Sequence, residues 1–418
     1  MLSLDELTAN TSFTTAGRHG KKVTLLPDPP RAERKYTVIS VDDHIVEPPH
    51  TFEGRMPAKF AESAPRVIEK DDGSQTWLYD GVELPNVGFN AVVGRPVDEW
   101  GSEPARFDEM RRGAFDIHAR IADMDLNGVY ASLNFPSFLP GFCGQRLQRT
   151  TKDTELAMAA VRAWNDWHLE EWAGTYPGRI VPCQIPWLLD PDVGAAMIYE
   201  NAERGFSAVT FSEDPSRLGF PTLHSGHWEP FIRACAATGT VINLHIGSSG
   251  ASPTTTSDAP PDVVGVLFFA YAMYAAVDWL FSLLPVRYPD LRVCLSEGGI
   301  GWVPALIDRL EHMETYNNMY GTWKGELTPA EVLRRNFYWC AVEDPSAFAL
   351  RERIDVDHIL LESDYPHCDS TWPRTQQVID REIGGLPADD IRKMTWENAS
   401  KLYRHDVPEA VQRDPDAF

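Results

Sequence analysis

Apolar residues along the chain fall into short, nearly continuous runs that alternate with longer stretches of helical periodicity. Such runs, rich in β-branched residues, are typical of parallel strands that helices cover on both faces. Helical patterns follow many of them, for example over residues 156–176 and 304–316. We expect eight strands, at Thr37–Val41, Val129–Phe135, Arg179–Trp187, Phe206–Ser212, Thr240–Ile246, Leu291–Glu297, Phe337–Glu343 and His358–Asp364.

Eight strands of this kind, most of them followed by a helix, predict an α/β fold of the (β/α)8 or TIM-barrel type. An open doubly wound sheet is the main alternative. That fold would place a glycine-rich phosphate-binding turn after the first strand, and the sequence has none there. We therefore expect one barrel domain over residues 36–405.

Three segments fall outside the regular alternation. Residues 1–35 lack sustained periodicity and predict an extended N-terminal arm that packs on a neighbouring subunit, and residues 406–418 form a C-terminal tail. Residues 48–114 are too many for a barrel loop, and they contain a hairpin pattern around the turn dipeptide Asp80-Gly81. We interpret this segment as an insertion after the first strand that folds over the catalytic mouth.

The most apolar segment is Gly265–Leu284, which is long enough to span a membrane. It contains Asp278 and lies between two predicted strands, which favours a helix buried by the barrel on one side and by a partner subunit on the other. The N-terminus has no charged-then-apolar signal pattern. We expect a cytoplasmic protein that forms a homo-oligomer or a complex with a related subunit.

Charge narrows the range of partners. The chain has 61 acidic and 38 basic residues, a net charge of −23, which repels phosphate backbones and anionic membranes. We expect a small-molecule substrate and neither nucleic acid nor membrane as a partner. The six cysteines form no CxxC pair, a pattern typical of buried free thiols in a reducing compartment.

Residues with metal-binding side chains follow several of the predicted strands. Asp42 and His44 follow the first strand two positions apart, so they point to the same side of an extended backbone. His245 ends the fifth strand, Glu297 the sixth and Asp364 the eighth. Because the carboxyl ends of barrel strands share one rim, these five side chains are expected to meet there. A rim so rich in acids needs a cation, which predicts a metal site.

Other residues near these strand ends are weaker candidates. Glu47 and His118 would be further metal ligands, although His118 reads equally well as a helix-end or lid histidine. His367 would hydrogen-bond the substrate. Aromatic residues after the strands would either pack in the core or line an apolar substrate pocket. They are Phe138, Trp187, Trp302 and Trp372.

Longer strings resemble a known family. VDDHIVEP, YPDLRVCLSEGGIGWVP, ESDYPHCDSTWP and WENASKLYR look like the amidohydrolase-related family, which includes aminocarboxymuconate-semialdehyde decarboxylase, and the resemblance runs from Tyr36 to Arg404. It implies that Asp42, His44 and His245 bind a metal. It also implies that Asp364 binds the metal and takes the proton of an activated water. The family's decarboxylases usually carry a histidine where this chain has Glu297, a departure that weakens the case for simple decarboxylation.

Two reactions suit this set of residues. With zinc or manganese, the site would hydrolyse or non-oxidatively decarboxylate a small organic acid or amide-like substrate, with Asp364, Glu297 and His245 as catalytic residues. With two irons, or iron and manganese, the additional carboxylate of Glu297 would suit a dinuclear non-haem monooxygenase, as found in some barrels of this family. A non-catalytic supporting subunit is a third hypothesis.

Overall fold

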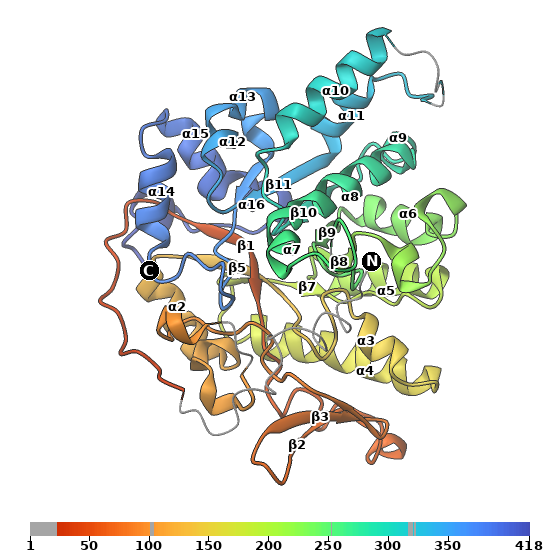
Figure 1. Cartoon of the computed structure of the whole chain (residues 1–418), viewed down its shortest axis with the longest axis vertical. Coiled ribbons are helices and arrows are strands. Elements are labelled where there is room, and N and C mark those ends of the chain that lie inside the picture. The colour runs from red at the N-terminus through yellow and green to blue at the C-terminus, as the bar shows by residue number, and fades with distance from the viewer. Residues whose placement is uncertain (1–22, 101–103, 252, 317–320, 322) are drawn as a thin grey trace.

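The computed structural model describes residues 23–100, 104–251, 253–316, 321 and 323–418. Within these residues the expected (β/α)8 barrel is confirmed, with parallel strands surrounded by helices (Figure 1). The barrel strands are β1 (Ile39–His44), β5 (Ala131–Phe135), β6 (Ile180–Val181), β7 (Cys183–Gln184), β8 (Ala208–Ser212), β9 (Val241–His245), β10 (Val293–Ser296), β11 (Phe337–Ala341) and β12 (Ile359–Leu361).

The order of the strands shows how the sheet closes. It runs β6-β5-β1-β12-β11-β10-β9-β8-β7, and every neighbouring pair is parallel. The two end strands, β6 and β7, are halves of the single expected strand Arg179–Trp187. They flank Pro182, which has no N–H to donate to a ladder. One half pairs with β5 and the other with β8, so the sheet closes on itself.

Helices surround the barrel on its outer side. In chain order they are α2 (Ile117–Asn127), α3 (Gln145–Arg149), α4 (Thr154–Trp167), α5 (Pro191–Arg204), α6 (Glu229–Thr238), α7 (Pro261–Leu267), α8 (Phe269–Phe281), α9 (Leu284–Arg287), α10 (Val303–Tyr316), α11 (Pro329–Asn336), α12 (Pro345–Ala349), α13 (Arg351–Ile354), α14 (Thr375–Ile383), α15 (Ala388–Arg392), α16 (Asn398–Tyr403) and α17 (Glu409–Arg413). The helical patterns at 156–176 and 304–316 correspond to α4 and α10.

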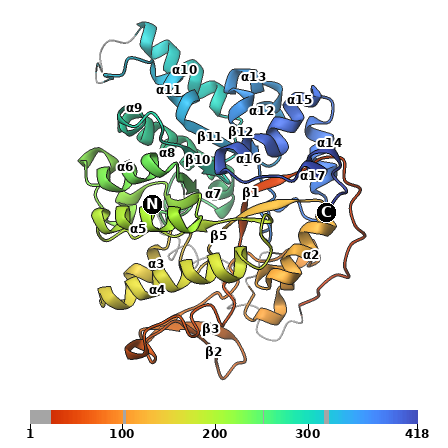
Figure 2. The same ribbon diagram turned by 180° about the vertical axis from the view of Figure 1, so that it is seen from behind.

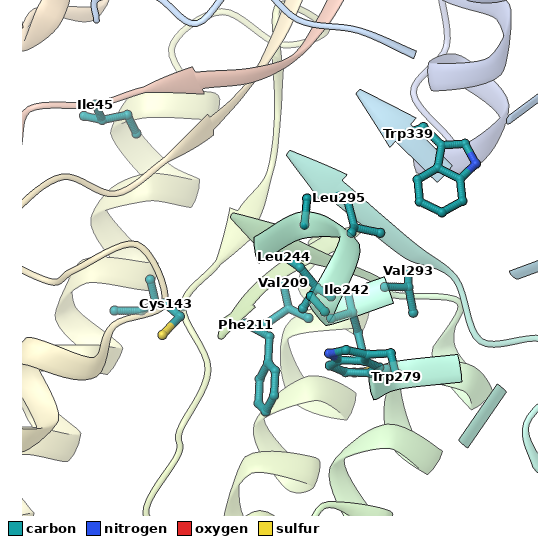
Figure 3. Packing of buried hydrophobic residues seen from close by; sticks show 14 of the residues in the cluster. Ile45, Cys143, Val209, Phe211, Ile242, Leu244, Trp279, Val293, Leu295 and Trp339 are labelled. Carbon is teal, nitrogen blue, oxygen red and sulfur yellow. The ribbon is translucent and has the colours of Figure 1, made fainter. Parts of the chain in front are cut away.

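Outward-facing strand residues build the larger core between sheet and helices. Figure 3 shows Ile242 and Leu244 of β9 beside Val293 and Leu295 of β10, with Trp279 of α8 beneath them. Trp279 meets the ring of Phe211 edge-on at 5.8 Å. Inward-facing residues form a second cluster, which Trp396 and the α16 residues Leu402 and Tyr403 continue.

The segment after β1 forms a small antiparallel sheet of β2 (Arg66–Glu69), β3 (Gln75–Tyr79) and β4 (Val82–Leu84). The expected hairpin is present, with Asp80 and Gly81 both at positive φ. The insertion was expected to fold over the catalytic mouth, but this sheet does not cover it. It lies beyond α4 (Figures 1 and 2), and the Tyr79 hydroxyl donates to the carbonyl of Leu147 at 3.0 Å. Only the later part reaches the rim, where the N–H of Val92 donates to the carbonyl of Pro366.

Residues 23–35 run extended along the outside of their own barrel (Figure 1). The N–H of Leu26 donates to Gly94 and that of Ala32 to Leu126, both at 2.7 Å. The first 22 residues of the expected arm lie outside the described residues. Among the described residues, the helical stretch Asp262–Phe281 is long and apolar enough to cross a membrane, and 33% of that stretch is buried in the protein.

Candidate metal centre

The five residues expected at the rim come together in the structure. Asp42 and His44 lie at the end of β1, His245 is the last residue of β9, Glu297 follows β10, and Asp364 lies three residues beyond β12. The strands β1 and β12 are neighbours, and so are β9 and β10. The cluster is therefore built from two separate stretches of the barrel wall.

A β-bulge in β1 directs two of these side chains inward. Ser40 pairs with Ser132 and Asp43 with Asn134, so β1 has one extra residue in this interval. Side chains of a regular strand alternate between its two faces, but the extra residue allows the consecutive residues Val41 and Asp42 both to face the barrel interior. Bulges of this kind redirect side chains beside active sites.

Asp42, His44 and His245 form a tight triangle. The Nε2 atoms of the two imidazoles are 3.1 Å apart, and Oδ1 of Asp42 lies 3.5 Å from one and 3.6 Å from the other. Tetrahedral ligands at about 2.0–2.1 Å from a zinc ion would be roughly 3.3 Å from one another. The three side chains thus have the spacing that one shared cation requires.

Asp364 adds a second carboxylate to this triangle. Its Oδ1 lies 3.3 Å from Nε2 of His44 and 3.1 Å from Nδ1 of His367. Asp42 and Asp364 are both fully buried, and none of their four carboxylate oxygens makes a hydrogen bond. Burial, followed by repulsion from neighbouring carboxylates, raises the pKa of both groups well above the ordinary aspartate value. Uncompensated buried carboxylates are costly, and a bound cation removes that cost.

The imidazole of His44 is held in its neutral form, in which it can donate a lone pair to a metal. Burial lowers the pKa of His44 well below its ordinary value, and the nearby His367 and His245 lower it further. Nδ1 of His245 is 2.7 Å from the carbonyl of Ile246, so this nitrogen carries the proton and Nε2 is left free to bind a metal. Burial also lowers the pKa of His367 to about 4.

Glu297 and His367 extend the cluster into a second, overlapping set of possible ligands. His44, Glu297, Asp364 and His367 offer ligand atoms within 4.8 Å of one another, and His44 belongs to both sets. Oε2 of Glu297 lies 2.9 Å from Nε2 of His245. Burial tends to raise the pKa of Glu297, but the interaction with His245, followed by that with His367, outweighs it and the pKa is lowered. The ring of His367 stacks on that of His44 at 3.8 Å.

Two of the candidate ligands have unusual backbones. Glu297 has φ +55° and Asp364 has φ +50°, a left-handed conformation that costs free energy in residues other than glycine. Hydrogen bonds hold both in place. The N–H of Asp364 donates to the carbonyl of Asp42 at 2.9 Å, and that of Glu297 donates to the Glu362 carboxylate at 3.2 Å.

Asp43 secures the loops that carry these ligands. It turns away from the triangle and accepts hydrogen bonds from the hydroxyls of Ser40, Ser132 and Ser363 and from the N–H of Tyr365. These partners lie on or beside β1, β5 and β12. Asp43 therefore joins three strands directly behind Asp42, His44 and Asp364.

Aromatic rings close the site on one side. The ring of Phe142 lies 4.2 Å from that of His245 and 5.1 Å from that of His44, and Phe135 lies 4.9 Å from His245. The guanidinium of Arg120, fully buried, donates to the carbonyl of His44 and lies 4.4 Å from the ring of Tyr365. These neighbours shield the carboxylates from water and strengthen their interaction with any cation.

The structure places two expected ligands away from the cluster. The Glu47 carboxylate is buried elsewhere, where it accepts hydrogen bonds from the N–H and hydroxyl of Ser137 and from the indole of Trp164 at 3.0 Å. His118 is exposed at the start of α2, and its Nδ1 lies 2.8 Å from the Tyr176 hydroxyl. Neither residue belongs to either set of clustered ligand atoms.

The four aromatic residues that were expected either in the core or along a substrate pocket make contacts within the protein. Trp187 belongs to the main core. The indole of Trp302 donates to the carbonyls of Gly298 and Gly299, and that of Trp372 donates to the carbonyl of Asp123. Phe138 stacks on Phe89 and lies under the guanidinium of Arg146.

Sequence reasoning missed several residues of the centre. His367 was expected mainly as a substrate contact and less strongly as a further imidazole ligand, and it lies among the possible ligands. Glu362 was not singled out, although it is buried beside Glu297 and raises the pKa of Asp42. The acid-rich string Glu362-Ser363-Asp364 was the available signal. Asp43 is recognisable only from its partners, which are distant in sequence.

Comparisons with known proteins identify one matching family and several similar folds. The family model described as amidohydrolase matches residues 76–405. A search of curated proteins finds no significant match. A crystal structure of an amidohydrolase from Mycobacterium avium subsp. paratuberculosis K-10 has a TM-score of 0.68 at 22% identity, covering 89% of this chain and 100% of that one.

Two decarboxylases are similar at lower identity. The 5-carboxyvanillate decarboxylase of Sphingomonas paucimobilis has a TM-score of 0.62 at 20% identity, covering 89% of this chain and 100% of that one. A dihydroxybenzoic acid decarboxylase from Polaromonas sp. JS666, with bound manganese and 2-nitroresorcinol, has a TM-score of 0.61 at 16% identity, covering 92% and 100%. At these identities the likeness shows the fold.

Proposed function

Because the chain belongs to the amidohydrolase family, we propose that it hydrolyses or non-oxidatively decarboxylates a small organic acid or amide-like substrate with the help of a divalent metal. One observation carries the proposal. The carboxylates of Asp42 and Asp364 are buried, accept no hydrogen bond from the described residues, and face the Nε2 atoms of the His44 and His245 imidazoles. A cation-binding function explains why a protein retains so costly an arrangement.

Asp42, His44, His245 and Asp364 would hold the ion, and mixed nitrogen and oxygen ligands suit zinc or manganese. The manganese in the Polaromonas decarboxylase supports the second choice. When bound, such an ion polarises a substrate oxygen and lowers the pKa of a water molecule.

The protein's own groups supply the proton transfers. We assign Asp364 as the general base, because its carboxylate lies at the rim beside His44 and His367, where it can accept or give a proton at Oδ1 or Oδ2. In hydrolysis it takes this proton from water. In decarboxylation it gives a proton to the carbon that loses carbon dioxide. Phe142 keeps bulk water from the imidazoles.

A panel of aromatic and aliphatic carboxylic acids and amides, incubated with manganese-loaded enzyme, tests this function. Turnover releases carbon dioxide for a decarboxylase, or an acid and an amine or alcohol for a hydrolase. Asp364→Asn should lower kcat by at least about 100-fold. Asp369→Asn alters a nearby exposed carboxylate and should retain activity. Equal activity of Asp364→Asn and wild type would refute the assignment of the base.

A second candidate function is a dinuclear non-haem iron, or iron–manganese, monooxygenase. The observation that favours it is the second ligand set, in which Glu297 and His367 join His44 and Asp364. Two irons per chain, together with oxygen consumption in the presence of a reductant, would favour this candidate. A single manganese or zinc with no oxygen uptake would favour the hydrolase or decarboxylase.

We also propose a cytoplasmic location and an assembly from more than one subunit. In this scheme, residues 1–35 are an arm, 36–405 a barrel with its insertion at 48–114, and 406–418 a tail. The buried state of five of the six free cysteines is in keeping with a reducing compartment.

A further inference from the structure

The loop after β10 carries Glu297 into the metal centre, and its backbone is unusual. Glu297 has φ +55° and Gly299 has φ +54°. The indole of Trp302 donates to the carbonyls of Gly298 and Gly299, at 3.1 and 2.9 Å, and so keeps the loop tightly turned. Positive φ costs free energy in a residue such as glutamate. Contacts from elsewhere in the barrel are therefore needed to keep Glu297 in this conformation.

Two buried acids supply these contacts, one at each end of the loop. Oε2 of Glu362, the residue after β12, accepts the N–H of Glu297 at 3.2 Å. Oδ1 of Asp344, which lies beyond β11, accepts the N–H of Ile300 at 3.2 Å. The strands β10, β11 and β12 are successive neighbours in the sheet. The loop that carries Glu297 is thus tied to the next two strands of the barrel.

The Glu362 carboxyl is buried beside the metal centre without being part of it. Its side chain belongs to a residue that is 4% exposed, and its Oε1 has no hydrogen bond within the described residues. It belongs to neither set of clustered ligand atoms. Burying such a group costs free energy. The contact that gains from it is the hydrogen bond with the Glu297 N–H.

The conformation of Glu297 decides where its carboxylate lies. Oε2 of Glu297 is 2.9 Å from Nε2 of His245, and Glu297 shares a ligand set with His44, Asp364 and His367. A return of Glu297 to an ordinary negative φ would turn its Cβ, and with it the carboxylate, away from His245. The N–H that fixes this angle is the one that Glu362 binds.

We propose that Glu362 is a positioning residue: by accepting the Glu297 N–H it holds Glu297 at positive φ and keeps its carboxylate among the metal ligands. The inference rests on the proposed metal-dependent function, and it applies whether the centre holds one ion or two. Partners that orient metal ligands in this way are commonly worth 10–100-fold in metal affinity.

A purely electrostatic role is the rival explanation. Burial, followed by repulsion from Glu362, raises the pKa of Asp42, so Glu362 is close enough to act on that ligand by charge. The two roles differ in what they require of the side chain. Positioning requires an acceptor oxygen and no charge, which glutamine also offers. An electrostatic role requires the charge, so glutamine and leucine would fail alike.

The test is the affinity of the full-length protein for Mn²⁺, measured from the electron paramagnetic resonance signal of the unbound ion. Glu362→Leu should raise the dissociation constant by about 10–100-fold, and Glu362→Gln should stay within about two-fold of wild type. Glu362→Ala repeats the test with a smaller side chain, and urea unfolding shows which variants fold. Glu47→Gln is the matched control, because Glu47 is also a buried acceptor of a backbone N–H but lies outside the ligand sets. It should leave the dissociation constant unchanged.

A double variant separates action through Glu297 from direct action on the ion. In a Glu297→Leu background, Glu362→Leu should weaken Mn²⁺ binding by no more than about two-fold, since the side chain to be positioned is gone. Effects that multiply in the double variant would overturn the proposal, and so would a Glu362→Gln protein that binds as weakly as Glu362→Leu. Wild type that binds Mn²⁺ as tightly as every Glu362 variant would overturn this inference alone. Wild type that binds neither Mn²⁺ nor Zn²⁺ would overturn the proposed function with it.

Discussion

The adjacent carboxylates of Asp42 and Asp43 offer a matched test of the metal centre. Both are buried in β1, but the surroundings of their carboxylates differ: that of Asp42 accepts no hydrogen bond from the described residues, whereas that of Asp43 accepts four. Replacing each with asparagine removes the charge and keeps the shape. We expect the free energy of unfolding of the metal-free protein to rise in Asp42→Asn and to fall in Asp43→Asn.

The magnitudes follow from these contacts. Asp42→Asn removes an uncompensated buried charge but leaves a buried amide, so the free energy of unfolding of the metal-free protein should rise by about 1–3 kcal/mol. Asp43→Asn replaces charge-assisted hydrogen bonds, worth roughly 1.5–3 kcal/mol each, by weaker neutral ones, and turns an amide N–H₂ towards existing donors. Burial raises the pKa of Asp43 and partly offsets this loss. A net loss of about 2–4 kcal/mol is expected.

Metal ions should narrow the stability difference between Asp42→Asn and the other two proteins. A ligand at 100 times its dissociation constant stabilises the folded state by about 2.7 kcal/mol. Wild type and Asp43→Asn should show this gain with manganese or zinc, and Asp42→Asn should lose most of it. The assay is urea unfolding with chelator and with added metal. A metal-free Asp42→Asn protein that is less stable than wild type, or that gains as much from metal, would refute the reasoning.

Three further substitutions test the residues outside the centre. Glu47→Gln should cost about 1–3 kcal/mol in urea unfolding, because Ser137 and Trp164 lose a charged acceptor, while metal content stays at the wild-type level. His118→Ala should change stability by less than about 0.5 kcal/mol and leave metal content and turnover unchanged, since the ring is exposed; loss of metal would restore it as a ligand. Burial lowers the pKa of His168 from 6.5 to about 3, so only the unfolded chain binds this proton between those values. Stability should therefore fall by up to about 1.4 kcal/mol per pH unit below pH 6.5, and His168→Gln should show a shallower fall; an equal fall in both would contradict this.

The barrel could be predicted because each buried parallel strand appears in the sequence as a short run of apolar residues. Their ends were less predictable. The first strand continues to His44 instead of ending at Val41, because Asp43 finds its hydrogen-bond partners on β5 and after β12. The third strand is divided at Pro182. The small sheet is beyond α4 instead of over the mouth, and nothing local to residues 66–84 shows where it docks.

The principal ligands were predictable for a geometric reason: all strands of a parallel barrel deliver their carboxyl ends to one rim. Glu47 shows where that reasoning stops. It is only three residues after His44, but the chain has already turned towards Ser137 and Trp164. Proximity in sequence therefore did not decide which acid reaches the centre, and the partners of Asp43 and Glu362 required the folded chain.

Metal content is the most direct test of the central claim. The protein would be purified without chelator and analysed by elemental mass spectrometry, together with His245→Ala and Asp364→Ala. The account predicts about one manganese or zinc ion per wild-type chain and much less in both variants. Wild-type protein that holds no metal even after reconstitution, or variants that retain all of it, would contradict the assignment of Asp42, His44, His245 and Asp364 as a metal centre.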